Sequence, residues 1–334
     1  MEFVTKKEKE FLYVISLIKN AKNKAFLKVN IELIDLYWNI GKYISKKIES
    51  AEWGDKVIAN LADYISKKNP ELKGFNFRNL HRMKQFYEVY KENTIVSALL
   101  TQLSWTHNLM IISKTKSMEE KIFYINLSIK ERYSSRELER QIDSGYFERV
   151  MISKVSPLVT KLPKDIVSSF KDTYILDFLD LPKDHSEKDL QKALIKNFKN
   201  FVLEFGKDFA FMGEEYKIQV GKNDYFIDLL FYHRGLRCLV VFELKIEDFK
   251  PEFLGKINFY LEALDRDVKK EYENPSVGVV LCKSKDNEVV EYALSRSLSP
   301  ALVSEYKTKL IDKDILRKKL NELYLFLDKN NKES

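Results

Sequence analysis

Two apolar segments of strand length lie close together in the chain, residues 226–232 (FIDLLFY) and 239–245 (LVVFELK). Both carry charge where a buried strand would carry none, namely Asp228 in the first and Glu243 and Lys245 in the second. Side chains alternate across a strand, so Glu243 and Lys245 point to the same face. The loop between the segments is short and contains a glycine, which predicts an antiparallel hairpin that brings Asp228 beside Glu243.

Two carboxylates and an ammonium inside an apolar sheet are costly unless something binds them. A hard divalent cation such as magnesium prefers carboxylate oxygens, so the pattern predicts a metal site. The structural alternatives are a pairing of Asp228 with Arg234 or Arg237, and an edge-strand charge pair of Glu243 and Lys245. The apolar run before Glu243 is typical of a central strand, and the three charges together favour the metal site.

The composition is that of a globular protein with two domains. Of 334 residues, 45% are hydrophobic and 32% are charged, which excludes a disordered chain. No apolar run reaches the roughly 18–20 residues of a membrane span, and the first residues show no signal-peptide core. Cys238 and Cys282 lie in apolar runs, so we expect reduced, buried thiols in a cytoplasmic protein. The net charge of +7 is compatible with a polyanionic partner but is spread along the chain.

The chain divides into a helical half and a mixed half. Residues 1–150 show apolar residues at helical spacing and capping-box patterns, so we predict an all-α domain. Residues 151–185 contain several prolines and little periodicity, which is typical of a connection between domains. Residues 186–334 are predicted to fold as αβββαβ. The predicted fold class is α+β multidomain, with an N-terminal all-α domain and a C-terminal α/β domain around a central mixed sheet.

The C-terminal domain is predicted to begin with a helix from Ser186 to about Phe205. Strands near 209–220, 225–232, 236–246 and 276–282 follow, with helices at 252–267, from about 286, and at 312–328. The inner face of the first helix runs through Leu190, Leu194 and Phe201 and reaches Glu204. A carboxylate at Glu204 can approach the sheet and join the metal or its water. A solvated helix face is an equally good interpretation of this residue alone.

The predicted helix 77–91 begins at an asparagine cap and has a polar side opposite its apolar stripe. Arg78, Arg82 and Gln85 lie on that side together with His81. Another helix precedes it, so the pair is compatible with a helix-turn-helix reader whose second helix enters a DNA groove. The alternative is an ordinary amphipathic helix with a solvated face.

Asp228 followed by Glu243-x-Lys245 resembles the motif of the PD-(D/E)XK nuclease superfamily, with Ile227 in place of the proline. Further blocks, spread over nearly the whole chain, resemble the YhcG family. In the C-terminal half these blocks run from Phe226 through 236–240 to 243–245, and continue at 249–252 and 258–261. In the N-terminal half they are residues 38–41, 53–54, 75–80, 82–87, 104–107 and 136–142.

The resemblance implies a restriction-endonuclease-like fold and a Mg²⁺-dependent nuclease, with Mn²⁺ as a second usable ion. It assigns Asp228, Glu243 and the main-chain carbonyl of Leu244 to the metal. It assigns Lys245 to positioning the attacking water or stabilising charge in the transition state.

One position departs from the family, which usually has glutamine where this chain has Lys256. A lysine there can contact a phosphate of the nucleic acid but cannot accept a hydrogen bond. Asn258 or Tyr260 is expected to make the missing contact.

We therefore expect an endonuclease that acts on nucleic acid, DNA in the first instance, and forms a homo-oligomer. Its helical domain is expected to recognise the target or a partner. Two alternatives stay open. One is a nucleic-acid-binding protein whose nuclease domain is catalytically silent, and the other is a helical oligomerisation scaffold with an accessory nuclease domain. The presence of Asp228, Glu243 and Lys245 argues against a catalytically silent domain, whereas Lys256 leaves that alternative open.

Overall fold

The computed structural model describes residues 6–155, 162–182, 184–295, 297 and 299–330. It contains two compact units, Met1–Ile142 and Asp143–Ser334. The boundaries expected from the sequence, at 150 and 186, differ from this division. The second unit already includes α8 (Tyr146–Val155) and the strand β1 (Thr173–Ile175), which lies inside the segment expected to be a connection.

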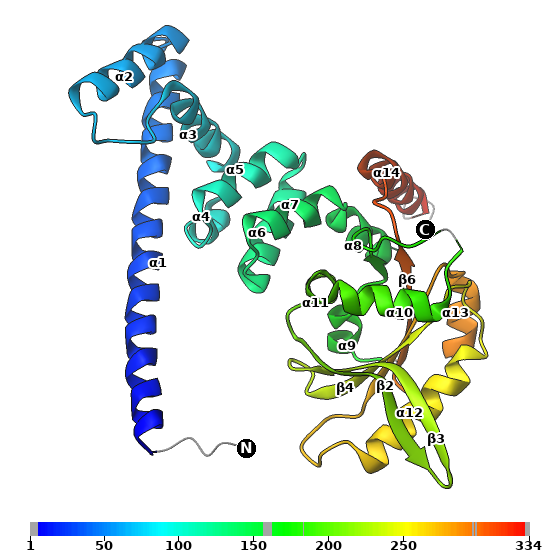
Figure 1. Ribbon diagram of the computed structural model, residues 1–334. Helices are drawn as coiled ribbons and strands as arrows, with labels where there is room; N and C mark the ends of the chain where they lie inside the picture. The colour runs from blue at the N-terminus through cyan, green and yellow to red at the C-terminus, as the bar shows by residue number, and fades with distance from the viewer. Residues whose placement is uncertain (1–5, 156–161, 183, 296, 298, 331–334) are drawn as a thin grey trace. The chain divides into compact units, whose positions relative to one another are not determined.

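The described part of the first unit is all-helical, as predicted (Figure 1). Its helices are α1 (Lys6–Glu49), α2 (Asp55–Lys68), α3 (Phe77–Tyr90), α4 (Thr94–Leu100), α5 (Trp105–Lys114), α6 (Met118–Glu131) and α7 (Ser135–Asp143). Ile44, Ile58, Leu80 and Met83 bring α1, α2 and α3 into one core cluster. The crossing of α1 and α3 requires Gly41, because a Cβ atom there would lie 2.1 Å from the carbonyl oxygen of Met83.

The second unit is built on a six-stranded mixed sheet in the order β1-β6-β5-β4-β3-β2. The strands after β1 are β2 (Phe209–Val220), β3 (Asn223–His233), β4 (Cys238–Leu244), β5 (Val277–Cys282) and β6 (Ala301–Lys307). The pairs β1–β6, β6–β5 and β5–β4 are parallel, whereas the pairs β4–β3 and β3–β2 are antiparallel. The predicted hairpin and mixed sheet are therefore present. The strands β1 and β6 were not predicted.

Helices cover both faces of this sheet. The apolar cluster on one face includes Leu190 and Leu194 of α10 (Glu187–Lys196) and Phe201 and Phe205 of α11 (Phe198–Phe205). The cluster on the other face includes side chains of α12 (Phe253–Asp267) and α13 (Asn287–Leu294). The unit also contains α9 (Lys164–Ser169) and α14 (Lys313–Asn330). The predicted single helix from Ser186 to Phe205 is in fact two helices, because the backbone leaves helical geometry at Asn197 (φ −102°, ψ 30°).

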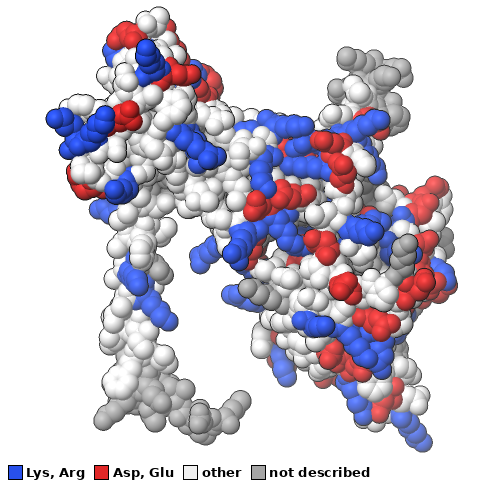
Figure 2. Space-filling model, turned by 45° about the horizontal axis from the view of Figure 1, so that its top comes forward, with Lys and Arg blue, Asp and Glu red and all other residues white. Residues whose placement is uncertain are grey.

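Two expectations about the whole chain can be compared with the structure. Cys238 and Cys282 are both buried free thiols, and burial raises the pKa of each to about 12. Among the described residues, no helix combines the length and the apolar character needed to cross a membrane. The face in Figure 2 shows Lys and Arg interspersed with Asp and Glu over the second unit, in line with a charge excess that is spread out.

Candidate active site

The three charged residues predicted to form the site, the trio of Asp228, Glu243 and Lys245, lie where the pairing of β3 with β4 ends. The last ladder pair on this side is Leu229 with Phe242, so the next residues along the two strands are Asp228 and Glu243. Here the backbone N–H of Leu244 donates to Asp228 Oδ2 at 2.8 Å instead of continuing the ladder. The hairpin turns at residues 234–237 and thereby brings the two carboxylates together, as the sequence predicted.

Glu243 is the buried centre of the site. Its side chain is 0% exposed, and its Oε1 accepts from Lys256 Nζ at 2.5 Å and lies 3.2 Å from Lys245 Nζ. Its second oxygen, Oε2, is buried without a hydrogen-bond partner. A buried carboxylate oxygen without a partner is costly, so this atom indicates where a cation would be stabilised.

Lys245 is held by a carboxylate that sequence reasoning missed. Its Nζ lies 3.1 and 3.0 Å from the two oxygens of Glu187, in the first turn of α10. One helical turn later, Gln191 Nε2 donates to the backbone oxygen of Asp228 at 2.9 Å. Glu187 and Gln191 are four residues apart, so one side of α10 forms a wall of the site. The capping box at Ser186 was visible in the sequence, but the contact of Glu187 with a lysine 58 residues away was not.

The helix α12 contributes Lys256 and Tyr260 from the opposite face of the sheet. Lys256 reaches Glu243, whereas Tyr260 is only 3% exposed and donates from its hydroxyl to the backbone oxygen of Phe226 at 2.7 Å. Tyr260 thus fixes β3 two residues before Asp228, and its ring lies 5.4 Å from Lys256 Nζ. The expected contact of Tyr260 with nucleic acid is not apparent, because its side chain is buried. Asn258 has a buried Oδ1 without a hydrogen-bond partner.

The electrostatics of the site favour binding of a cation. Burial, and then the neighbouring charge of Glu243, raise the pKa of Asp228 to about 6 despite the hydrogen bond from Leu244. Burial alone would lower the pKa of Lys256, but its hydrogen bond to Glu243 and that carboxylate's charge outweigh it and raise the pKa to about 12. Likewise, the contacts of Lys245 with Glu187 and Glu243 raise its pKa against the effect of burial.

The available donors fit a hard divalent cation. Asp228 and Glu243 supply carboxylate oxygens, and Leu244, between Glu243 and Lys245, supplies a main-chain carbonyl, which is the oxygen-only set that Mg²⁺ prefers. In the described ranges, no group of three His, Cys, Asp or Glu side chains forms a closed metal cage. Two carboxylates and one carbonyl would leave the remaining positions of an octahedral ion to water, and Mg²⁺ usually keeps several waters.

The structure does not bring Glu204 to this site. Glu204 is fully buried on α11, and its Oε1 accepts from the backbone N–H of Ile175 in β1 at 3.0 Å and lies 3.0 Å from Lys171 Nζ. The strand β1 is three positions from β4 in the sheet, roughly 14 Å at about 4.8 Å per strand. Glu204 thus anchors an edge strand.

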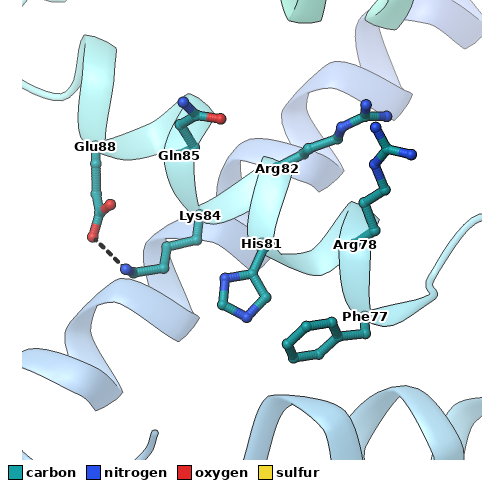
Figure 3. A pocket seen from close by; sticks show the side chains of 7 residues that line it. All are labelled: Phe77, Arg78, His81, Arg82, Lys84, Gln85 and Glu88. Carbon is teal, nitrogen blue, oxygen red and sulfur yellow. Dashed lines mark ion pairs between the residues drawn. The ribbon is translucent and has the colours of Figure 1, made fainter. Parts of the chain in front are cut away.

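The nucleic-acid-binding residues predicted in the helical domain share one surface of α3. Arg78, Arg82 and Gln85 line a depression of about 520 Å³ (Figure 3), and the other lining residues are Phe77, His81, Lys84 and Glu88. The helix begins at Asn76, whose side chain accepts from the backbone N–H of Asn79. Its buried side is Leu80, Met83, Phe86 and Tyr90, which leaves the basic side outward.

Comparisons with known proteins show the family of the chain. Residues 167–321 match the model of the YhcG PDDEXK nuclease domain, and residues 13–149 match the DUF1016 N-terminal domain. The chain is 30% identical to a protein of Escherichia coli (strain K12) named "Putative nuclease YhcG", over 92% of both chains. The crystal structure of a repair endonuclease from Pyrococcus abyssi aligns over 39% of this chain and 49% of that one, at 17% identity and a TM-score of 0.25. On the strength of the full-length relative and the two domain models, the chain belongs to the YhcG family and carries its PDDEXK nuclease domain.

Proposed function

We propose that the protein is a metal-dependent endonuclease that hydrolyses phosphodiester bonds in DNA. The observation that carries this proposal is the buried Glu243, whose Oε2 lacks a hydrogen-bond partner beside Asp228 at the end of the β3–β4 hairpin. The nuclease domain of the family and the name of the bacterial relative support the same activity.

Asp228, Glu243 and the Leu244 carbonyl would hold one or two Mg²⁺ ions, with Mn²⁺ as a substitute. A divalent ion bound there supplies an activated water and stabilises the leaving oxygen of a phosphodiester. The chain's own contribution is to keep these oxygens together at one end of the hairpin, with Glu243 fully buried and Asp228 partly buried. Burial of Glu243 strengthens every electrostatic interaction made there.

Lys245 would stabilise the negative charge that develops on the phosphate as the bond breaks. Its side chain is 13% exposed and is restrained from two sides, by Glu187 at 3.0 Å and by Glu243 at 3.2 Å. Such restraint lets a donor act on a transition state without reorganisation. Glu187 acts through Lys245 and is therefore a positioning residue in this scheme. Lys256, 43% exposed at its side chain, is available to a phosphate of the DNA backbone.

Cleavage of a substrate panel tests this proposal. Duplex, branched and single-stranded DNA and RNA would be incubated with Mg²⁺ or Mn²⁺ and either the wild type or Asp228→Asn. The matched control is Asp224→Asn, the same change on the same strand at a partly exposed ion pair with Lys217. We expect metal-dependent cleavage of DNA by the wild type and the control and none by Asp228→Asn. Equal cleavage by all three proteins, or binding without cleavage by the wild type, would reject the proposal, the second result in favour of a silent binding protein.

We further propose that α3 contacts the DNA backbone through Arg78 and Arg82, with Gln85 beside them. Guanidinium groups are suited to phosphate oxygens, and both line the same depression. Replacing both arginines with alanine should weaken binding to all sequences and lower the slope of affinity against salt by about two. Lys130→Ala, a change at the 75% exposed lysine of α6, is the control. An unchanged salt slope in the double variant would exclude this surface.

A further inference from the structure

The first half of α1 exposes an apolar surface that the proposed activity does not use. Between residues 11 and 36, thirteen of the described large apolar side chains are at least 39% exposed. The most exposed of them, at 57–65%, are Phe11, Leu12, Tyr13, Ile18, Phe26, Leu27 and Val29. In Figure 2 the visible side of this part of α1 is mostly uncharged, with a few lysines. Packing of α1 begins within the last part of this segment, where Asn30 donates to the backbone oxygens of Thr101 and Leu103 and Ile34 is buried.

The first part of this segment, residues 11–18, has the pattern of a buried helix, and a polar run, residues 19–24, follows it. Residues 11–18 read FLYVISLI, so apolar side chains point in every direction around two turns of helix. A helix that is apolar all round is normally covered by protein. A projecting helix is also marginal in water without tertiary packing. The exposed segment therefore requires a partner that surrounds or pairs with it.

We propose that the partner is a second copy of this chain, and that residues 11–36 of α1 pack against the same segment of that copy. A buried aromatic side chain covers about 150–250 Å² and an aliphatic one covers less, so the half-exposed residues offer roughly 70–100 Å² each. Thirteen such residues exceed the roughly 800 Å² per partner that a standard stable interface buries. Because every copy carries the same surface, a two-fold pair satisfies both helices at once.

The shape of the segment is suited to interdigitating helices. Ala25, Val29, Leu33 and Leu36, with Lys28 and Glu32, line a hollow of about 540 Å³ along one side of α1. A hollow between side chains of one helix is what a projecting apolar side chain of a facing helix fills. A membrane surface fits less well, because a helix lying on lipid keeps one polar face, and residues 11–18 have none.

The mass of the full-length protein tests this proposal. Sedimentation equilibrium would be measured on the wild type and on Ile18→Glu/Leu27→Glu. Both changes are at exposed sites, so the free energy of unfolding of the isolated chain should change little. The control is Tyr272→Glu/Tyr292→Glu, which places the same charges at side chains 73% and 76% exposed. We expect twice the 39.5 kDa chain mass for the wild type and the control. The α1 variant should dissociate with a constant raised at least about a hundredfold.

A cross-linking measurement keeps the proposal testable if the variant folds poorly. Leu27→Cys should form a disulfide-linked dimer under mild oxidation, whereas Tyr272→Cys should not. A monomeric wild type at micromolar concentration, a dimer that survives the α1 changes, or cross-linking that is equal at both positions would overturn it. So would a monomeric wild type that binds anionic phospholipid vesicles through α1.

Discussion

Two fully buried glutamates of the second unit, Glu204 on α11 and Glu243 on β4, differ in the groups that surround them. Glu204, beside the edge strand β1, has a lysine and a backbone N–H from the nearby chain at its Oε1. Glu243, at the end of β4, has two lysines at its Oε1, while its Oε2 has no hydrogen-bond partner. Burial and a nearby lysine are common to both and therefore do not define a catalytic site.

The two glutamates also differ in which groups lie beside them. At β1 the contacts of Glu204 join Lys171 and Ile175, so the carboxylate holds a strand in place. At β4 a second carboxylate, Asp228, lies beside Glu243, and its raised pKa indicates that the cations present do not fully offset the burial of both charges. We interpret the first region as structural and the second as the site of chemistry.

Catalysis should separate the two glutamates most strongly. Glu243→Gln should lower the single-turnover rate of metal-dependent cleavage by about a thousandfold or more, since it removes a ligand and a charge at the reacting centre. Glu204→Gln should leave the rate per folded molecule within about twofold. Equal losses of cleavage rate per folded molecule in the two variants would show that Glu243 is no more important for catalysis than Glu204. Circular dichroism would determine the folded fraction.

The free energy of unfolding should depend more on Glu204 than on Glu243. Glu204→Gln removes the carboxylate charge that lies 3.0 Å from the nearly buried Lys171 Nζ, so we expect a loss of about 3 kcal/mol in the free energy of unfolding. Urea denaturation of the full chain measures it. The double variant Lys171→Met/Glu204→Met should recover most of the loss, because it removes both charges. A single variant as stable as the wild type would show that Glu204 does not anchor β1.

The positioning role of Glu187 should produce a smaller effect. Glu187→Gln weakens the hold on Lys245, and we expect kcat to fall about tenfold with KM nearly unchanged. Because Glu187 is 42% exposed at its side chain, its contribution to stability should stay below about 1 kcal/mol. Glu288→Gln, in the first turn of α13, is the matched control. A kcat equal to that of the wild type would show that Lys245 does not depend on Glu187 for its position.

The smallest effect concerns the stability of metal-free protein as pH changes. Burial and the charge of Glu243 raise the folded-state pKa of Asp228 to about 6, above the ordinary aspartate value of about 3.8, so ionisation costs stability as pH rises between these values. In EDTA, Asp228→Asn should match the wild type near pH 4 and exceed its stability by about 1–2 kcal/mol at pH 7.5. Saturating Mg²⁺ should then stabilise only the wild type. A variant less stable than the wild type at pH 7.5 in EDTA would contradict the raised pKa.

The hairpin and its trio could be predicted because their signal is local. Charges within two adjacent apolar strands reveal the site, and the predicted strands differ from β3 and β4 by no more than two residues at either end. The strands β1 and β6 gave no such signal. β1 has three residues, and β6 follows a proline and includes Ser304 and Glu305, so only pairing with neighbouring strands makes them strands.

Glu187 and Glu204 show why the remainder of the site was harder to predict. The predicted inner face was extended from α10 to Glu204 as if the helix were continuous, but the break at Asn197 starts a new helix with its own direction. Glu204 is buried, as its helical spacing suggested, yet it faces β1. Glu187 appeared to be an ordinary acidic residue of a first helical turn, and only tertiary structure places it beside Lys245.

Calorimetric titration of Mn²⁺ into the metal-free protein tests most directly whether Glu243 and Asp228 form a cation site. It needs no knowledge of the substrate. The wild type and Glu204→Gln should bind the ion with the same Kd, whereas Glu243→Gln should bind it at least about a hundredfold more weakly. Binding by Glu243→Gln with the wild-type affinity would show that the unpartnered oxygen of Glu243 is not where the metal binds.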